Sequence, residues 1–233
     1  MILNIEQFRS GDNLAYLIFG QKHAMAVDGV AWQEILSFLK EHKLTLSLVA
    51  NTHQHFDHTG GNAHLLKATG AKLLEFNELS DNKEIYIDSE KIIVYRTPGH
   101  TNDSVCFHTG NALFSGDTLF NATVGNCFSG DLKSFYLSIK RLMELPDDTT
   151  VFAGHDYVRD SLVFARRLEP DNAEIDRFRD MYNPDCVYST MADERKVNPY
   201  LRFNEETIIK LLRKLKLPHA TQWERWQSLM SID

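Results

Sequence analysis

The feature that most limits how this chain can fold is residues 52–58, which read THQHFDH. Three imidazoles, of His53, His55 and His58, and the carboxylate of Asp57 lie within six positions there. Imidazole nitrogens and carboxylate oxygens bind zinc well, and a closed structural zinc site needs only about four of them. The segment follows residues 44–50, an apolar run that predicts a buried strand. We therefore expect a metal-ligand loop at the end of a strand.

Three further ligand candidates come later in the chain, each in a turn after a strand-like run. They are His100 in TPGHT, Asp117 in SGDT and His155 in AGHD. Singly, a loop histidine is more often a surface residue, and a Gly-Asp pair is usually a plain turn. Jointly, seven ligand types at the ends of successive strand-like segments predict a metal site. Their surplus over a single tetrahedral set favours two ions.

Periodicity divides the chain into a mixed α/β part and a helical part. Strand-like runs cover residues 2–8, 14–19, 23–28, 44–50, 72–75, 84–88, 91–97, 104–108, 112–115 and 150–153. Amphipathic spacing predicts helices over residues 31–43 and 132–145, and another that starts near residue 61. These alternating elements predict one α/β metal-binding domain over residues 1–157.

After residue 157 the sequence pattern changes from mixed strands and helices to helices alone. Residues 158–168, 171–182, 204–215 and 221–230 read as helices. They are separated by Pro170, Pro184, Pro199 and Pro218, and proline disfavours helix in the residue before it. We therefore expect residues 158–233 to form a small helical domain that binds substrate.

Charge and hydropathy limit the partners of the chain. Its 233 residues carry a formal net charge of -7, and a polyanion normally needs a basic face, so we expect no nucleic-acid and no membrane partner. The longest apolar runs are far shorter than the ~20 residues of a membrane helix, and Met1 leads directly into a strand-like segment. We therefore expect a cytoplasmic protein. Three cysteines without close pairing indicate neither a disulfide framework nor a cysteine zinc site.

The HxHxDH loop with the later histidine, aspartate and histidine resembles the metallo-β-lactamase superfamily. The resemblance implies an α/β fold, an αβ/βα four-layer sandwich with the metals at one edge of two sheets and, here, a C-terminal helical domain. It also implies two divalent metal ions, with zinc expected first and iron or manganese also acceptable to such ligands. The implied ligands are His53, His55 and His100 for one ion, Asp57, His58 and His155 for the other, and Asp117 as a bridge.

Motifs at residues 97–101, 116–120, 154–157, 164–172 and 198–202 look more specifically like the glyoxalase II family, the hydroxyacylglutathione hydrolases. This likeness covers nearly the whole chain, including the helical tail. It implies hydrolysis of S-(2-hydroxyacyl)glutathione, such as S-lactoylglutathione, to a hydroxy acid and a free thiol through a metal-bridging hydroxide. Asp57 would orient that hydroxide while ligating the second metal.

The same resemblance implies that Tyr157 and Arg202 hold the peptide part of the thiol. Neutral Asn126 stands where the family has a basic residue, and Glu205 follows where a second cation is expected. A thioesterase with a thiol carrier other than glutathione is therefore one alternative. A mononuclear iron persulfide dioxygenase and a regulatory protein with a silent site are two more. The sequence leaves the oligomeric state open.

Overall fold

The computed structural model describes residues 3–232. Its first sheet has the strand order β1-β2-β3-β4-β5. These strands are β1 (Asn4–Ser10), β2 (Asn13–Phe19), β3 (His23–Val27), β4 (Thr45–Ala50) and β5 (Lys72–Leu73). The first three form an antiparallel meander, whereas β3, β4 and β5 run parallel because α1 (Trp32–His42) and α3 (Asn62–Thr69) return the chain between them. The segment after β4 therefore leaves the carboxyl edge of the parallel strands.

The two faces of the first sheet pack against different layers. On β2, Leu14 and Tyr16 belong to a core that includes residues of the second sheet, whereas Leu17 packs with Ile35 of α1 and Leu65 of α3. Successive side chains of a strand point to opposite faces, so an apolar run such as β2 can serve both layers. This continuous burial explains why residues 14–19 lack a polar alternation.

The second sheet has the order β13-β12-β9-β8-β7-β6. Its strands are β6 (Glu84–Ile87), β7 (Glu90–Arg96), β8 (Val105–Thr109), β9 (Ala112–Gly116), β12 (Thr150–Ala153) and β13 (Ser189–Thr190). Strands β6 to β9 are antiparallel neighbours, and β12 lies parallel to β9 because α4 (Leu132–Leu142) joins them. The chain therefore leaves β9 and β12 at the same edge.

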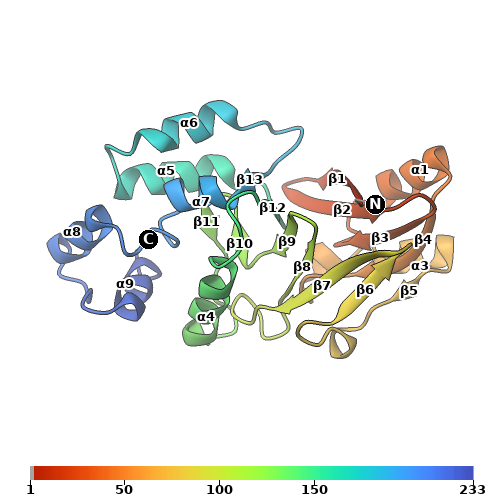
Figure 1. The fold of residues 1–233 in the computed structure, drawn as a ribbon, viewed down its shortest axis with the longest axis horizontal. Coiled ribbons are helices and arrows are strands. Elements are labelled where there is room, and N and C mark those ends of the chain that lie inside the picture. Colours follow the sequence, from red (N-terminus) through yellow and green to blue (C-terminus); the bar gives the residue numbers. More distant parts are fainter. Residues whose placement is uncertain (1–2, 233) are drawn as a thin grey trace.

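The two sheets face each other, with helices on their outer faces (Figure 1). The Tyr16 ring of the first sheet meets the Phe114 ring of the second at a centroid distance of 5.1 Å. On the other side of the second sheet, Leu113 and Val151 pack with Phe135 of α4. The predicted αβ/βα four-layer sandwich is confirmed.

The tail contains α5 (Val158–Leu168), α6 (Ala173–Met181), α7 (Met191–Val197), α8 (Glu206–Lys214) and α9 (Gln222–Leu229). Helices α8 and α9 lie together at one end of the molecule, where α9 contacts α4 (Figure 1). The four predicted tail helices are confirmed, but the tail also contains α7 and the short strand β13, which the sequence prediction missed. Of the helices described, none is both long and apolar enough to cross a membrane.

Short elements account for the other errors of the sequence prediction. The ligand segment was expected to be a loop throughout, yet α2 (Phe56–Thr59) forms one helical turn within it. The 3₁₀ helix η1 (Phe76–Glu78) and the hairpin strands β10 (Leu119–Phe120) and β11 (Thr123–Val124) were also missed. Strands of two residues and helices of a single turn are too short to show a hydrophobic period. Helix α4 ends at Leu142, three residues before the predicted end.

Candidate metal centre

The structure brings all seven predicted ligand residues together at one edge of the sandwich. They come from the ends of strands in both sheets: the segment after β4, which includes α2, and the turns after β7, β9 and β12. Within each of two groups, one possible ligand atom per residue lies within 4.8 Å of all the others. The groups are His53, His55, His100 and Asp117, and Asp57, His58 and His155.

In the first group, three imidazole nitrogens point toward one another. His55 Nδ1 lies 2.9 Å from His53 Nε2 and 3.1 Å from His100 Nε2. The carboxylate of Asp117 faces the same point, with Oδ2 at 3.4 Å from His100 Nε2 and 3.8 Å from His53 Nε2. All these residues except His55 are buried. Four donors around one point match the ligand number of a zinc ion.

The second group repeats the arrangement with two histidines and a carboxylate. His58 Nε2 lies 3.2 Å from His155 Nε2, and Asp57 Oδ2 lies 3.4 Å from His155 Nε2. Asp117 reaches this group as well, with Oδ1 at 3.4 Å from His58 Nε2 and Oδ2 at 3.5 Å from His155 Nε2. The Asp117 carboxylate therefore lies between the two groups.

A buried carboxylate outside the predicted set orients the first histidines. Asp28 Oδ2 accepts hydrogen bonds from His58 Nδ1, at 3.0 Å, and from the Thr52 hydroxyl, at 2.7 Å. Since the Thr52 proton is used in that bond, Thr52 Oγ1 accepts from His53 Nδ1, at 3.1 Å. Both histidines thus carry their protons on Nδ1 and direct Nε2 lone pairs inward. Such outer contacts raise the basicity of metal-binding imidazoles.

A backbone carbonyl holds His100 in the same tautomer, with the proton on Nδ1. Its Nδ1 donates to the carbonyl of Asn126 at 2.9 Å, which leaves the Nε2 lone pair facing the cluster. Asp117 Oδ1 is buried and accepts no hydrogen bond within the described part of the chain. Inward-facing lone pairs and an unpaired carboxylate oxygen repel one another unless a cation lies between them. The residues present therefore fit divalent metal.

The electrostatics of the cluster indicate where positive charge is favoured. Burial lowers the pKa of His53 to about 2, and the neighbouring His58 adds to the effect. Burial also opposes protonation of His58, but the carboxylates of Asp28 and Asp117 outweigh it and raise the pKa of His58 to about 10. Without a bound cation, these two carboxylates favour a second proton on His58. The cluster thus attracts positive charge at His58 Nε2, and a bound cation would replace that proton.

Glycine is required where backbone passes the cluster. A Cβ on Gly154 would lie 2.3 Å from Asp117 Oδ1 and 2.9 Å from His58 Cε1. A side chain there would occupy the place of the carboxylate. The glycine before His155 therefore makes room for the residue that faces both groups.

Sequence reasoning missed two supporting residues, Asp28 and Asn13. Asp28 ends a predicted strand, and Asn13 lies between two predicted strands. In the structure, Asn13 Nδ2 lies 3.2 Å from Asp57 Oδ2 and 3.1 Å from the Asp57 carbonyl. Neither residue has a local sequence signal, because the partner of Asp28 lies 30 positions away and that of Asn13 lies 44 positions away.

Tyr157 lies beside the cluster. Its ring stacks on the His155 ring at a centroid distance of 4.8 Å and packs edge-on against Phe120. The residue remains 37% exposed. Burial, reinforced by the charge of Asp12, raises the pKa of Tyr157 to about 12. Its hydroxyl thus keeps its proton at neutral pH and can donate a hydrogen bond to a bound molecule.

Arg202 has a different environment. Its Nε and one terminal nitrogen lie 2.6 and 2.9 Å from the two oxygens of buried Glu169, and the side chain is only 16% exposed. Among the described residues, no contact joins Arg202 to the histidine cluster. The structure therefore places Tyr157 at the candidate site and Arg202 in an ion pair within the tail.

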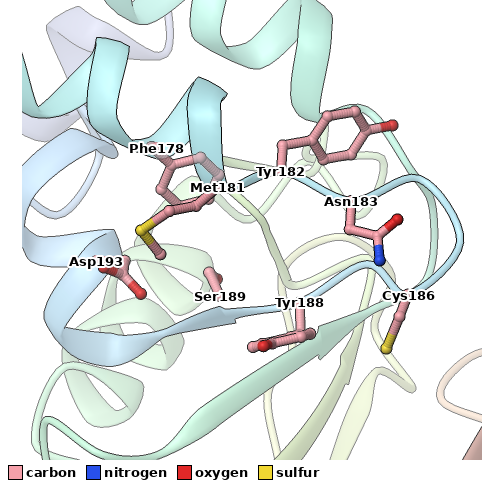
Figure 2. A pocket seen from close by; sticks show the side chains of 8 residues that line it. All are labelled: Phe178, Met181, Tyr182, Asn183, Cys186, Tyr188, Ser189 and Asp193. Atoms are coloured by element: carbon pink, nitrogen blue, oxygen red, sulfur yellow. The ribbon is translucent and has the colours of Figure 1, made fainter.

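The cavity shown in Figure 2 does not coincide with the predicted site. A cavity of about 260 Å³ lies between the end of α6 and β13, and Figure 2 shows the side chains that line it. None of the predicted ligands contributes to this lining, and its only acid is Asp193, which caps α7. The chemistry of the converging histidines is the stronger indicator of function.

Comparisons with known proteins agree with the geometry. The family model of the metallo-beta-lactamase superfamily matches residues 10–83 and 76–155, and the model of the hydroxyacylglutathione hydrolase C-terminus matches residues 156–230. A hydroxyacylglutathione hydrolase of Psychromonas ingrahamii is 30% identical, over 91% of this chain and 90% of the relative. One from a Polaromonas species is 35% identical, over 87% and 86%.

Solved structures show the same fold. The crystal structure of ETHE1 from Myxococcus xanthus aligns with a TM-score of 0.69 and 25% identity, over 98% of this chain and 100% of that one. The structure of TTHA1623 in a di-iron-bound form aligns with a TM-score of 0.63 and 23% identity, over 84% and 98%. The superfamily match and the histidine and aspartate cluster together imply divalent metal binding. The chain belongs to the metallo-β-lactamase superfamily and, within it, to the hydroxyacylglutathione hydrolase family.

Proposed function

We propose that this chain hydrolyses the thioester bond of S-(2-hydroxyacyl)glutathione, such as S-lactoylglutathione, and releases a hydroxy acid and the free thiol. The observation that carries the proposal is the convergence of two ligand groups on Asp117 in a chain whose tail matches the hydroxyacylglutathione hydrolase C-terminus. Relatives with that name match this chain along most of its length.

We propose two divalent ions, zinc first, with iron or manganese as alternatives. His53, His55 and His100 would hold one ion, Asp57, His58 and His155 the other, and Asp117 would contact both. When bound, such ions lower the pKa of water toward ~7 and stabilise the oxyanion that forms on a carbonyl under attack.

The chain's own part in the reaction is positioning. The Asp57 side chain is 49% exposed, and the Asn13 amide fixes one of its oxygens, so the carboxylate can accept a proton from an attacking water. Tyr157 would donate its hydroxyl to the substrate. The leaving thiolate needs no obligatory acid, because a thiol pKa is only about 8.5. Because water is the attacking group in this reaction, no serine or cysteine nucleophile is required.

Arg202 stays a proposed substrate contact, by family resemblance. Glu169 already engages its guanidinium, and Thr207 donates to the same carboxylate. A substrate carboxylate would therefore have to share the guanidinium with Glu169. We also propose a metal-binding domain of residues 1–157 and a substrate-binding domain of residues 158–233, a division that the two family-model matches support. A cytoplasmic location stays a proposal.

The test is the release of free thiol from S-D-lactoylglutathione by the metal-loaded chain and by Asp57→Asn. We expect rapid hydrolysis by the wild type and a loss of at least about a hundredfold in the variant, the size of a lost general base. Oxygen uptake with glutathione persulfide separates the dioxygenase alternative. A metal-loaded wild type that consumes oxygen with that substrate and releases no thiol from the thioester would refute the proposal.

A further inference from the structure

The helical tail supplies none of the proposed ligands, yet it holds the hairpin on which two groups of the metal centre depend. Strands β10 and β11 connect Asp117 to Asn126, whose carbonyl accepts the His100 proton. The hairpin pairs only Leu119 with Val124 and Phe120 with Thr123. An isolated two-stranded hairpin is marginally stable at best, so its position must come from outside contacts.

The turn of this hairpin is strained. Ala122, its second residue, has a φ of 71°, in the left-handed region that favours glycine. Its side chain is fully buried. Surrounding groups must therefore hold the backbone in this conformation.

Helix α7 and the residue that follows it, Asn198, provide these groups. Both oxygens of the Glu194 carboxylate lie 3.0 Å from the backbone nitrogen of Ala122. Asn198 Nδ2 donates to the carbonyl of Thr123 at 2.9 Å and to Glu194 Oε2 at 2.7 Å. Both side chains are fully buried. The tip of the hairpin is thus fixed to α7 by a closed set of hydrogen bonds.

A displacement of the hairpin would reach the ligands directly. A Cβ on Gly125, just after β11, would lie 2.0 Å from the Asp117 carbonyl and 3.1 Å from His100 Nδ1. The backbone that leaves the hairpin thus lies against both residues, with little free space between them. Cores packed this closely transmit small shifts.

We infer that Glu194 and Asn198 are positioning residues of the metal centre, which hold β10 and β11 so that Asp117 and the Asn126 carbonyl keep the geometry for metal binding. The inference rests on the proposed metal site. It assigns the C-terminal region a role in completing that site, through α7, besides substrate binding.

The test measures zinc affinity of the full-length chain by competition with a chromophoric chelator. Glu194→Ala and Asn198→Ala should each weaken binding about tenfold or more, the effect of removing outer contacts at metal sites. Glu194→Gln should restore most of it, because the amide oxygen can still accept from Ala122. Cobalt-loaded alanine variants should also show altered visible absorption bands, which report ligand geometry.

Asn172→Ala is the matched control. Asn172 Nδ2 donates to the Lys196 carbonyl at 2.9 Å, so it also holds α7 but does not touch the hairpin. This variant should lose stability and keep wild-type zinc affinity. Alanine variants at 194 and 198 that lose stability similarly, yet keep wild-type zinc affinity and cobalt bands, would overturn the inference.

If Glu194→Ala does not fold, the zinc affinities of Asn198→Ala and Asn198→Ser test the inference instead. Both variants leave the Glu194 carboxylate bonded to Ala122. Because the readout is metal binding, failure to hydrolyse the thioester would refute the proposed reaction and leave this inference standing. A wild type that binds no zinc would overturn both the metal site and the inference.

Discussion

Asp28 shows how much of the metal centre depends on single residues that are not ligands. It is buried, and its two oxygens accept from His58 Nδ1, from the Thr52 hydroxyl and from the Thr52 backbone nitrogen, at 2.7 to 3.0 Å. All three of these hydrogen bonds depend on the position of the Asp28 carboxylate. Asp28 therefore fixes the orientation of His58 and, through Thr52, that of His53.

Asp28→Asn should weaken zinc binding by about 10- to 100-fold. In either orientation, the new amide directs its NH₂ group at another donor, His58 Nδ1 or the Thr52 backbone nitrogen. Chelator competition measures the change. Asp88→Asn is the control, because Asp88 also bonds a histidine, His23, at 2.6 Å, but on the surface. Equal zinc affinities for Asp28→Asn and the wild type would contradict the role of Asp28.

Glu194 should make stability depend on pH. Burial raises the pKa of Glu194 to about 7, from 4.5, despite hydrogen bonds from Asn198 and Ala122. The folded state therefore binds this proton more tightly than the unfolded chain. The resulting stability is fully present below about pH 4.5 and is lost as pH rises through about 7, by roughly 3 kcal/mol at most.

Comparison with Glu194→Gln isolates this effect, because glutamine does not ionise. From pH 4.5 to pH 7, the free energy of unfolding of the wild type should fall relative to that of the variant. Urea denaturation at several pH values measures both. A difference between the two proteins that stays constant over this range would show that Glu194 titrates near its usual pKa.

At the scale of elements, α9 and α4 stabilise each other through aromatic packing. Trp226 of α9 is fully buried, with ring centroids 5.6 Å from Phe135 and 5.7 Å from Tyr136 of α4. Trp226→Ala should lower the free energy of unfolding by about 3–5 kcal/mol. Trp226→Phe should cost less, since the indole nitrogen has no hydrogen-bond partner among the described residues.

Val163→Ala provides the baseline for that measurement, because Val163 is 71% exposed on α5. Its effect on the free energy of unfolding should stay within about 0.5 kcal/mol. If Trp226→Ala unfolded at the same urea concentration as Val163→Ala, the packing of α9 on α4 would not contribute to stability.

Elements with a full hydrophobic period could be predicted from the sequence. Strand β12 and helix α5 begin and end at the predicted residues, because each has a clear apolar pattern and a turn at its boundary. Strand β13 could not be predicted, since two residues have no period and β12 alone defines their pairing. Helix α7 is short and mostly charged, and its capping box at Thr190 was the one local signal.

At the scale of the whole molecule, the candidate site combines two kinds of information. Ligands such as His53 and Asp117 could be found from residue type and turn position. Supporting residues could not, because Asp28 and Asn13 meet the site only when the first sheet forms. Glu194 reaches the hairpin across 72 positions of sequence. Contacts of this kind depend on the tertiary fold and leave no local pattern.

The zinc titration of the metal-free chain, with thiol release from S-D-lactoylglutathione as the readout, tests the two-metal hydrolase most directly. Hydrolysis should be negligible without metal, should rise until two equivalents are bound and should proceed without oxygen uptake. A chain that binds two zinc ions and releases no thiol would contradict the proposed reaction. Full activity at one equivalent would contradict the two-metal site.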